Sequence, residues 1–262
     1  MATMQINGMT LYYEQYGHGY PLILIAGYCC DHSYWTLMLN KLMSDYQVII
    51  FDNRGSGQTQ DAGEAFTLET MASDVMTLIQ QLGIHRPHLV GHSMGGAIAQ
   101  IIARNFSEKI NKMVVLNSSA KFNVRTNQAM GSLLQLRKAN APVELLIEAV
   151  MPWLFSCSFL AVPENVAMFK NALMNYPYPQ SVEDQERQFK ALLSFDSNSW
   201  LHEIKTATLV MTCEEDIIAL PSESRQLKNG IDQAELTILE GGHSSPIEQA
   251  DNLCQMIQKF LR

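Results

Sequence analysis

Short apolar runs alternate along this chain with segments in which apolar residues recur every three or four positions. Runs of continuous apolarity predict strands buried on both faces of a sheet. The runs are Pro21–Ala26, Gln47–Phe51, His88–Val90, Lys112–Leu116, Thr208–Thr212 and Glu235–Leu239. The first 17 residues predict a further pair of strands, the second of them over Met9–Tyr13. The pattern therefore predicts eight strands.

The segments between these runs predict helices. Leu68–Leu82 carries an apolar stripe at helical spacing, with Thr67 as a candidate cap and Gly83 as a stop signal. Further helices are predicted at Trp35–Met43, Met94–Asn105, Ser222–Asn229 and Ile247–Leu261. Strands that alternate with helices of this length indicate an α/β fold, a mostly parallel sheet with helices on both faces.

One long stretch interrupts the alternation of strands and helices. Residues 117–205 contain helical patterns, aromatic residues and the turn Pro177–Pro179, without a convincing strand. We expect a helical cap inserted after strand 6, lying over the carboxyl edge of the sheet. The predicted division is a core of residues 1–119 and 206–262 and a cap of residues 120–205.

Charge and cysteine usage narrow the class of protein. The chain has 262 residues and a formal net charge of −8, which disfavours a nucleic-acid or anionic membrane partner. Its five cysteines form no paired zinc spacing, so free thiols in a reducing compartment are expected. The N-terminus lacks the basic and apolar regions of a signal peptide. We expect a cytoplasmic protein.

The stretch LVGHSMGG, residues 89–96, places Ser93 between glycines at the end of an apolar run and the start of a helix. This is the G-x-S-x-G pattern of a nucleophile elbow, in which a sharp strand–turn–helix junction exposes a serine hydroxyl. Crowding by the adjacent strands and helix explains Gly91 and Gly95 at the flanking positions. A serine between glycines can also be an ordinary loop, but the strand before it and the helix after it favour the elbow.

A nucleophilic serine needs a histidine to accept its proton and an acid to orient that histidine. His243 follows the last strand and Asp216 follows the strand before it, so both are expected at the same sheet edge as Ser93. The order serine, acid, histidine is the one this architecture uses. Glu214 and Glu215 adjoin Asp216 and remain alternatives, although Asp216 lies furthest into the loop.

An oxyanion hole requires two N–H groups near the serine. Met94 supplies one at the helix start, and Tyr28, after Gly27 in the loop AGYCCDHSYW, is the expected second donor. The apolar cap segment MPWLFSCSFL is expected to pack over Ser93. We therefore predict that Gly27 binds substrate together with Trp153, Phe155 and Phe159.

Together, the Gly27 loop, DNRGSG, GHSMGG, Asp216 and GGHSSPIE resemble the α/β-hydrolase superfamily over nearly the whole chain. Within it, VVLNSSAKFN and DNRGSG are most similar to the 3-oxoadipate enol-lactonases. Carrier-linked methyl esterases and non-haem haloperoxidases are similar as well. Dehalogenases and epoxide hydrolases of this fold carry aspartate at the elbow, so Ser93 argues against both.

The sequence departs from the family in the oxyanion loop. The family usually has His-Gly at this turn, whereas this chain has Ala26-Gly27. The backbone donor is preserved, but a side chain that normally holds the loop is missing. His32 and the Tyr28 ring are candidates to replace it.

The sequence thus predicts a serine hydrolase that cleaves a small or medium, largely apolar ester, lactone or thioester, with no cofactor and no metal. Perhydrolysis or C–C bond hydrolysis by the same triad is one alternative. A ligand-binding member of the fold without turnover is the other.

Overall fold

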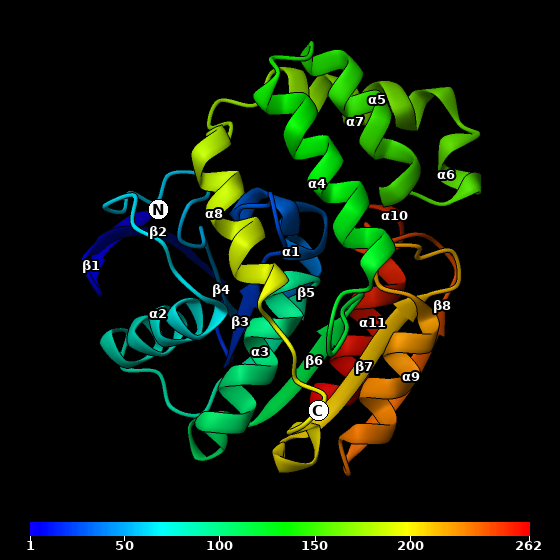
Figure 1. The fold of residues 1–262 in the computed structure, drawn as a ribbon. Helices are drawn as coiled ribbons and strands as arrows, with labels where there is room; N and C mark the ends of the chain where they lie inside the picture. The colour runs from blue at the N-terminus through cyan, green and yellow to red at the C-terminus, as the bar shows by residue number, and fades with distance from the viewer.

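The computed structural model describes residues 1–262 and centres on one eight-stranded sheet in the order β1-β2-β4-β3-β5-β6-β7-β8 (Figure 1). The strands are β1 Ala2–Ile6, β2 Met9–Tyr16, β3 Tyr20–Ile25, β4 Tyr46–Phe51, β5 His88–His92, β6 Lys112–Leu116, β7 Ala207–Cys213 and β8 Ala234–Leu239. The pairings of β1 with β2 and of β2 with β4 are antiparallel, and all others are parallel. The predicted mostly parallel eight-stranded sheet is confirmed.

Continuous apolar strands arise because this sheet is covered on both faces. Successive side chains of a strand point to opposite faces. In β6, Met113 and Val115 belong to one apolar core, whereas Val114 and Leu116 belong to the other. A strand with two buried faces must therefore be apolar at every position, which is the pattern seen in the sequence.

Helices form both covering layers. The helices that flank the sheet are α1 Thr36–Leu42, α2 Leu68–Gln81, α3 Met94–Asn105, α9 Pro221–Gly230, α10 Ser245–Glu248 and α11 Ala250–Leu261. Helices α2, α3 and α9 pack on one face, and α1 and α11 pack on the other. The Thr67 side chain caps α2 as predicted, accepting a hydrogen bond from the N–H of Thr70.

Between β6 and β7, where the sequence predicts a helical insertion, the structure has five α-helices. They are α4 Val124–Lys138, α5 Val143–Leu154, α6 Cys157–Leu160, α7 Pro163–Met174 and α8 Val182–Leu193. Figure 1 shows α4 to α7 beyond the ends of the central strands, with α8 running back towards α3. We call residues 124–193 the cap. No helix in the structure is both long enough and apolar enough to span a membrane.

Two predicted helices differ from the structure. A single helix over Ile247–Leu261 is wrong, because α10 and α11 are separated at Gln249, whose backbone has φ −131° and ψ 29°. Helix α1 is preceded by a 3₁₀ turn at His32–Trp35, so the predicted segment Trp35–Met43 begins inside that turn. Both breaks depend on local backbone angles that apolar periodicity does not encode.

Candidate active site

Ser93 lies at the junction of β5 and α3 in a strained backbone conformation. Its φ is 53° and its ψ is −118°, a combination that costs a non-glycine residue about 1–3 kcal/mol. Two hydrogen bonds hold this residue: its N–H donates to the carbonyl of Leu116 at 2.9 Å, and its carbonyl accepts from Ser118 Oγ at 2.7 Å. The strain is thus supported by the end of the neighbouring strand β6.

The glycines beside Ser93 are required by close backbone contacts. A Cβ atom at Gly91 would overlap the carbonyl oxygen of Gly95, and one at Gly95 would overlap the carbonyl oxygen of Ile25. Gly96, which lies outside the five-residue elbow pattern, is constrained as well, because its Cβ would lie 2.6 Å from Ser118 Cβ. The local sequence therefore folds into an elbow that no larger residue at these positions permits.

The structure brings Ser93, His243 and Asp216 together from three separate loops. Nε2 of His243 lies 3.0 Å from Ser93 Oγ, and its Nδ1 lies 2.9 Å from Asp216 Oδ2. A carboxylate only accepts hydrogen bonds, so Nδ1 carries the proton and Nε2 is free to accept one from serine. Glu214 and Glu215 are exposed, and Glu215 instead accepts the N–H of Cys157 at 2.9 Å.

Asp216 is buried, yet its surroundings favour the charged form. Burial by itself raises the pKa of a carboxyl group, but the charge and hydrogen bond of His243, together with other donors, outweigh that effect and lower the pKa of Asp216. Asn117 Nδ2 donates to Oδ2 at 2.8 Å, and the N–H groups of Ile218 and Ala219 donate to Oδ1 at 2.9 Å each. Asn117 directly follows β6. The sequence did not predict its role, because that role depends on a contact with Asp216 in the loop after β7.

His92, inside the elbow motif, faces away from the serine hydroxyl and supports His243. Its Nε2 lies 2.9 Å from the carbonyl oxygen of His243 and 3.2 Å from the Tyr34 hydroxyl. Burial lowers the pKa of His92 to about 3, so the ring stays neutral and its Nε2–H donates to the His243 carbonyl. His92 thereby fixes the backbone of the histidine loop.

Of the two residues predicted as oxyanion donors, Met94 directly follows Ser93, and Tyr28 follows a glycine that packs against the elbow. Met94 is the first residue of α3, so its N–H belongs to the first turn, where no intrahelical acceptor exists. Gly27 lies directly against the elbow, because a Cβ built on it would be 3.1 Å from Ser93 Cβ. Tyr28 follows Gly27, and its ring packs near Phe189 of the cap with centroids 6.0 Å apart.

The aromatic residues predicted to bind substrate lie in the cap. Phe155 and Phe159 stack with ring centroids 4.2 Å apart and are buried in a small apolar cluster with Ile147 and Met151. Trp153 is half-buried. The structure thus places both Phe side chains inside the cap's own core, where they stabilise its shape.

Cys29 and Cys30 occupy the loop after Tyr28. The Cys29 side chain is exposed, yet burial among surrounding atoms raises the pKa of its thiol to about 12. A thiol with so high a pKa stays protonated at neutral pH. The structure therefore gives no reason to treat Cys29 as a competing nucleophile.

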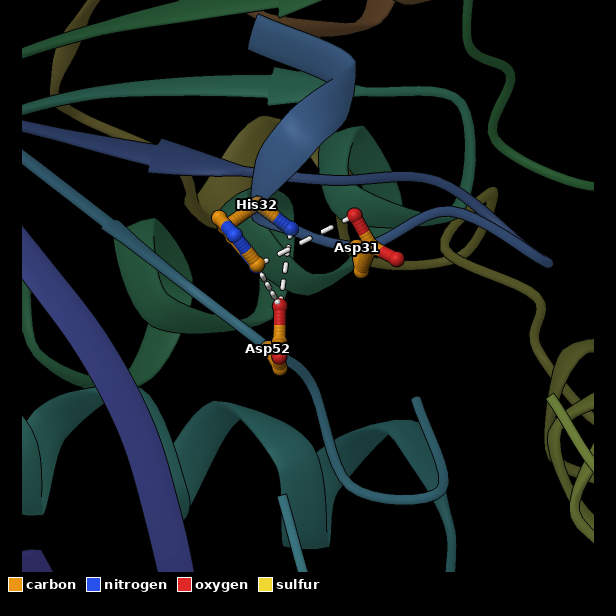
Figure 2. Close-up of side chains that lie close together, drawn as sticks. All are labelled: Asp31, His32 and Asp52. Carbon is orange, nitrogen blue, oxygen red and sulfur yellow. Dashed lines mark hydrogen bonds and ion pairs between the residues drawn. The ribbon is translucent and has the colours of Figure 1, made fainter. Parts of the chain in front are cut away.

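Three potential metal ligands, Asp31, His32 and Asp52, lie within 4.8 Å of one another (Figure 2). Their hydrogen bonds describe a loop anchor. Asp52 Oδ1 accepts from His32 N at 2.8 Å and lies 2.6 Å from His32 Nδ1, while Oδ2 accepts from Gln58 N at 2.7 Å. Coordination of a cation would have to displace these donors, so the cluster is better suited to holding the loop.

The sheet order, the elbow and the contacts among Ser93, His243 and Asp216 together define a class of protein. The family model described as the alpha/beta hydrolase fold matches residues 20–250, and the chain belongs to that family.

Related proteins align over nearly the full length of this chain. One is "Putative carbamate hydrolase RutD" of Rhizobium rhizogenes, 26% identical over 96% of this chain and 98% of that protein. Another is "AB hydrolase superfamily protein YisY" of Bacillus subtilis, 29% identical over 96% of this chain and 95% of that protein. The enol-lactonase of Burkholderia xenovorans LB400 superposes with a TM-score of 0.86 at 24% identity, covering 99% of both chains.

Proposed function

We propose that this hydrolase cleaves a carboxylic ester, lactone or thioester through an acyl-enzyme on Ser93. The observation that carries the proposal is the continuous contact from Ser93 Oγ to His243 Nε2 at 3.0 Å and from His243 Nδ1 to Asp216 at 2.9 Å. A serine hydroxyl becomes nucleophilic when a neutral imidazole accepts its proton and a carboxylate stabilises the resulting charge.

In the first half-reaction, Ser93 Oγ forms a bond to the substrate carbonyl carbon while its proton moves to His243 Nε2. Negative charge then develops on the carbonyl oxygen, and the N–H groups of Tyr28 and Met94 stabilise it. As the tetrahedral intermediate collapses, the bond to the leaving oxygen or sulfur breaks. That atom takes the proton from His243, and the acyl group stays on Ser93.

In the second half-reaction, water replaces the leaving group. His243 Nε2 accepts a proton from water as its oxygen attacks the acyl carbon, and the same two N–H groups hold the oxyanion. Collapse breaks the bond to Ser93 Oγ, which recovers its proton from His243. Asp216 stays ionised throughout, which the lowered pKa of its carboxyl group supports.

The triad alone does not determine which kind of bond the protein cleaves. The names of relatives mention a carbamate hydrolase and an enol-lactonase, and both carbamates and enol lactones present a carbonyl that this mechanism attacks. The apolar cap supports a small or medium substrate with little charge. Perhydrolysis and C–C bond hydrolysis use the same triad and are the competing chemistries.

The test is a substrate panel assayed with wild type, Ser93→Ala and Glu235→Gln, the last a change at an exposed β8 residue outside the triad. The panel contains p-nitrophenyl acetate, butyrate and octanoate, an enol lactone, an alkyl thioester and a p-nitrophenyl carbamate. We expect hydrolysis of at least one acyl compound by wild type and by the Glu235→Gln control, with loss in Ser93→Ala. Hydrolysis that persists in Ser93→Ala would refute the proposal. If no compound is hydrolysed, labelling by a fluorophosphonate distinguishes a hydrolase with a narrow substrate range, which is labelled, from a ligand-binding protein, which is not.

A further inference from the structure

The loop that carries Tyr28 is held by residues from distant parts of the chain. Because Ala26 replaces the family's usual histidine, the loop has lost one side chain that could fasten it. Asn53 Nδ2 donates to the carbonyl of Ala26 at 3.0 Å, which anchors the peptide two residues before Tyr28. On the other side of Tyr28, the N–H of Cys29 donates to Gln188 Oε1 at 3.4 Å.

Gln188 lies on α8 of the cap and is completely buried. Its Nε2 donates to the carbonyl of Arg54 at 2.9 Å and to Ser56 Oγ at 2.7 Å. Both amide protons are thus committed to the loop that follows β4. The amide oxygen must then point the other way, towards Cys29, so the orientation of the side chain is fixed by its own donors.

The backbone of Cys29 needs such support. Its φ is 59°, in the left-handed region that residues other than glycine seldom adopt. Tyr28 therefore sits between an anchored carbonyl at Ala26 and a strained residue whose N–H is held by the cap. If the Cys29 N–H were released, the strained backbone could relax and the direction of the Tyr28 N–H would change.

We propose that Gln188 is a positioning residue that holds the oxyanion loop from the cap, so that the second donor of the hole is aligned only when α8 is docked. This inference rests on the proposed function, because it assigns a task to the Tyr28 N–H in that reaction. In this chain, where Ala26 offers no polar side chain, Gln188 fastens the oxyanion loop from the cap.

The experiment compares Gln188→Met with Gln180→Met. Methionine keeps the length and most of the volume of glutamine while removing the amide. Gln180 is a matched control, because its Nε2 also binds the loop after β4, at the carbonyl of Gly55 at 2.6 Å, without contacting Cys29. Measured quantities are kcat, KM, the rate of fluorophosphonate labelling and Tm.

We expect Gln188→Met to lower kcat and the labelling rate by about 10-fold to 100-fold, since a misaligned donor loses stabilisation of the transition state while substrate binding is retained. KM stays within about twofold, and Gln180→Met keeps wild-type kcat. Equal kcat losses in both variants, or a change confined to KM or Tm, would overturn the proposal. Equal rates in wild type and Ser93→Ala would instead refute the proposed function and this inference with it.

Discussion

Steric exclusion at the elbow is the strongest constraint at the scale of single residues. Ser93 keeps an unfavourable backbone conformation because β3, β5 and α3 approach so closely that Gly91 and Gly95 admit no side chain. The surrounding fold offsets this strain, and in the proposed mechanism the strained conformation directs the Ser93 hydroxyl at the substrate. The consequence is that even a single methyl group at these positions is disruptive.

We predict that Gly95→Ala lowers the free energy of unfolding by about 2 kcal/mol or more, because its Cβ would overlap the carbonyl of Ile25. Gly131→Ala is the control, since Gly131 is also helical and its Cβ would lie 3.5 Å from Phe189, an ordinary contact. There, the higher helix propensity of alanine predicts a gain of up to about 1 kcal/mol. Urea denaturation measures both, and equal effects would contradict the account.

Asp216, the proposed acid of the triad, gives a second prediction. Asp216→Asn retains the shape of the side chain but removes the charge that stabilises protonated His243, so we expect kcat to fall about 1,000-fold or more. Glu215→Gln, one residue away and exposed, is expected to keep wild-type kcat. Steady-state assays with the best substrate of the panel provide the measurement. If Glu215→Gln matched or exceeded the loss in Asp216→Asn, the acid would be misassigned.

The three triad residues could be predicted from the sequence, whereas the residues that support them could not. Ser93, Asp216 and His243 follow from a local motif and from positions after strands, and the structure places all three in contact. Asn117 and Gln188 could not be inferred, because their partners lie 99 and 159 residues away and no local pattern encodes those contacts. Such supporting residues are visible only once the chain has folded.

At the scale of elements, the loops after β3 and β4 are joined by the contact between His32 and Asp52. Asp31, Asp52 and Glu14 of β2 all face the imidazole, and the ring of Tyr12 lies 4.9 Å from it. Burial disfavours the charged ring, but the hydrogen bond and charge of Asp52 outweigh it, so the pKa of His32 is raised. The cap contributes Tyr176, whose pKa is raised by burial and by Asp31.

A raised pKa has a definite effect on stability. The folded protein holds the His32 proton more tightly than the unfolded chain does, so this contact stabilises fully below about pH 6.5 and is lost as pH rises through the folded pKa. We expect the Tm of wild type to exceed that of His32→Asn most at about pH 6, with the difference shrinking towards about pH 9. Calorimetry across this range would contradict the assignment if the difference grew with pH.

Element boundaries follow the apolar pattern in some elements but not in all: β5 extends to His92, two residues beyond the predicted His88–Val90. The strand at Lys112–Leu116 and the helix at Met94–Asn105 match the structure residue for residue, because strong apolar patterns and flanking polar residues delimit them. The C-terminal helix was wrong at Gln249, where Glu248 turns back to bind the histidine loop and the cap. Glu248, the last residue of α10, accepts the N–H groups of Gly242 and Ser156, and the backbone angles of Gln249 end the helix there.

At the scale of the whole molecule, the cap is fastened to the loop that carries Tyr28 and to the loop that carries His243. Gln188 reaches the oxyanion loop, and on the opposite side Glu248 of α10 joins the cap to the histidine loop. Glu248 Oε1 accepts the N–H groups of Gly242 at 3.0 Å and Ser156 at 3.2 Å, and the N–H of Ser244 donates to the carbonyl of Leu154 at 2.8 Å. Movement of the cap would therefore disturb both loops on which the proposed mechanism depends.

Glu248 provides the prediction at this scale. We expect Glu248→Ala to lower the free energy of unfolding by about 2 kcal/mol, because it leaves the N–H groups of Gly242 and Ser156 without their acceptor. It should also reduce kcat, because the loop of His243 loses an anchor. The exposed Glu235→Gln serves as control, with an expected change within about 0.5 kcal/mol. A Glu248→Ala protein as stable and active as the control would show that the cap is not fastened here.

The measurement that tests the central claim most directly is covalent labelling of Ser93. Purified wild type is treated with an alkyl fluorophosphonate, and intact-protein mass spectrometry followed by peptide mapping locates the adduct. The account predicts one phosphonyl group on Ser93, none in Ser93→Ala, and strongly slowed labelling in His243→Ala, where the proton acceptor is missing. An unlabelled wild type, or an adduct on any other residue, would contradict it.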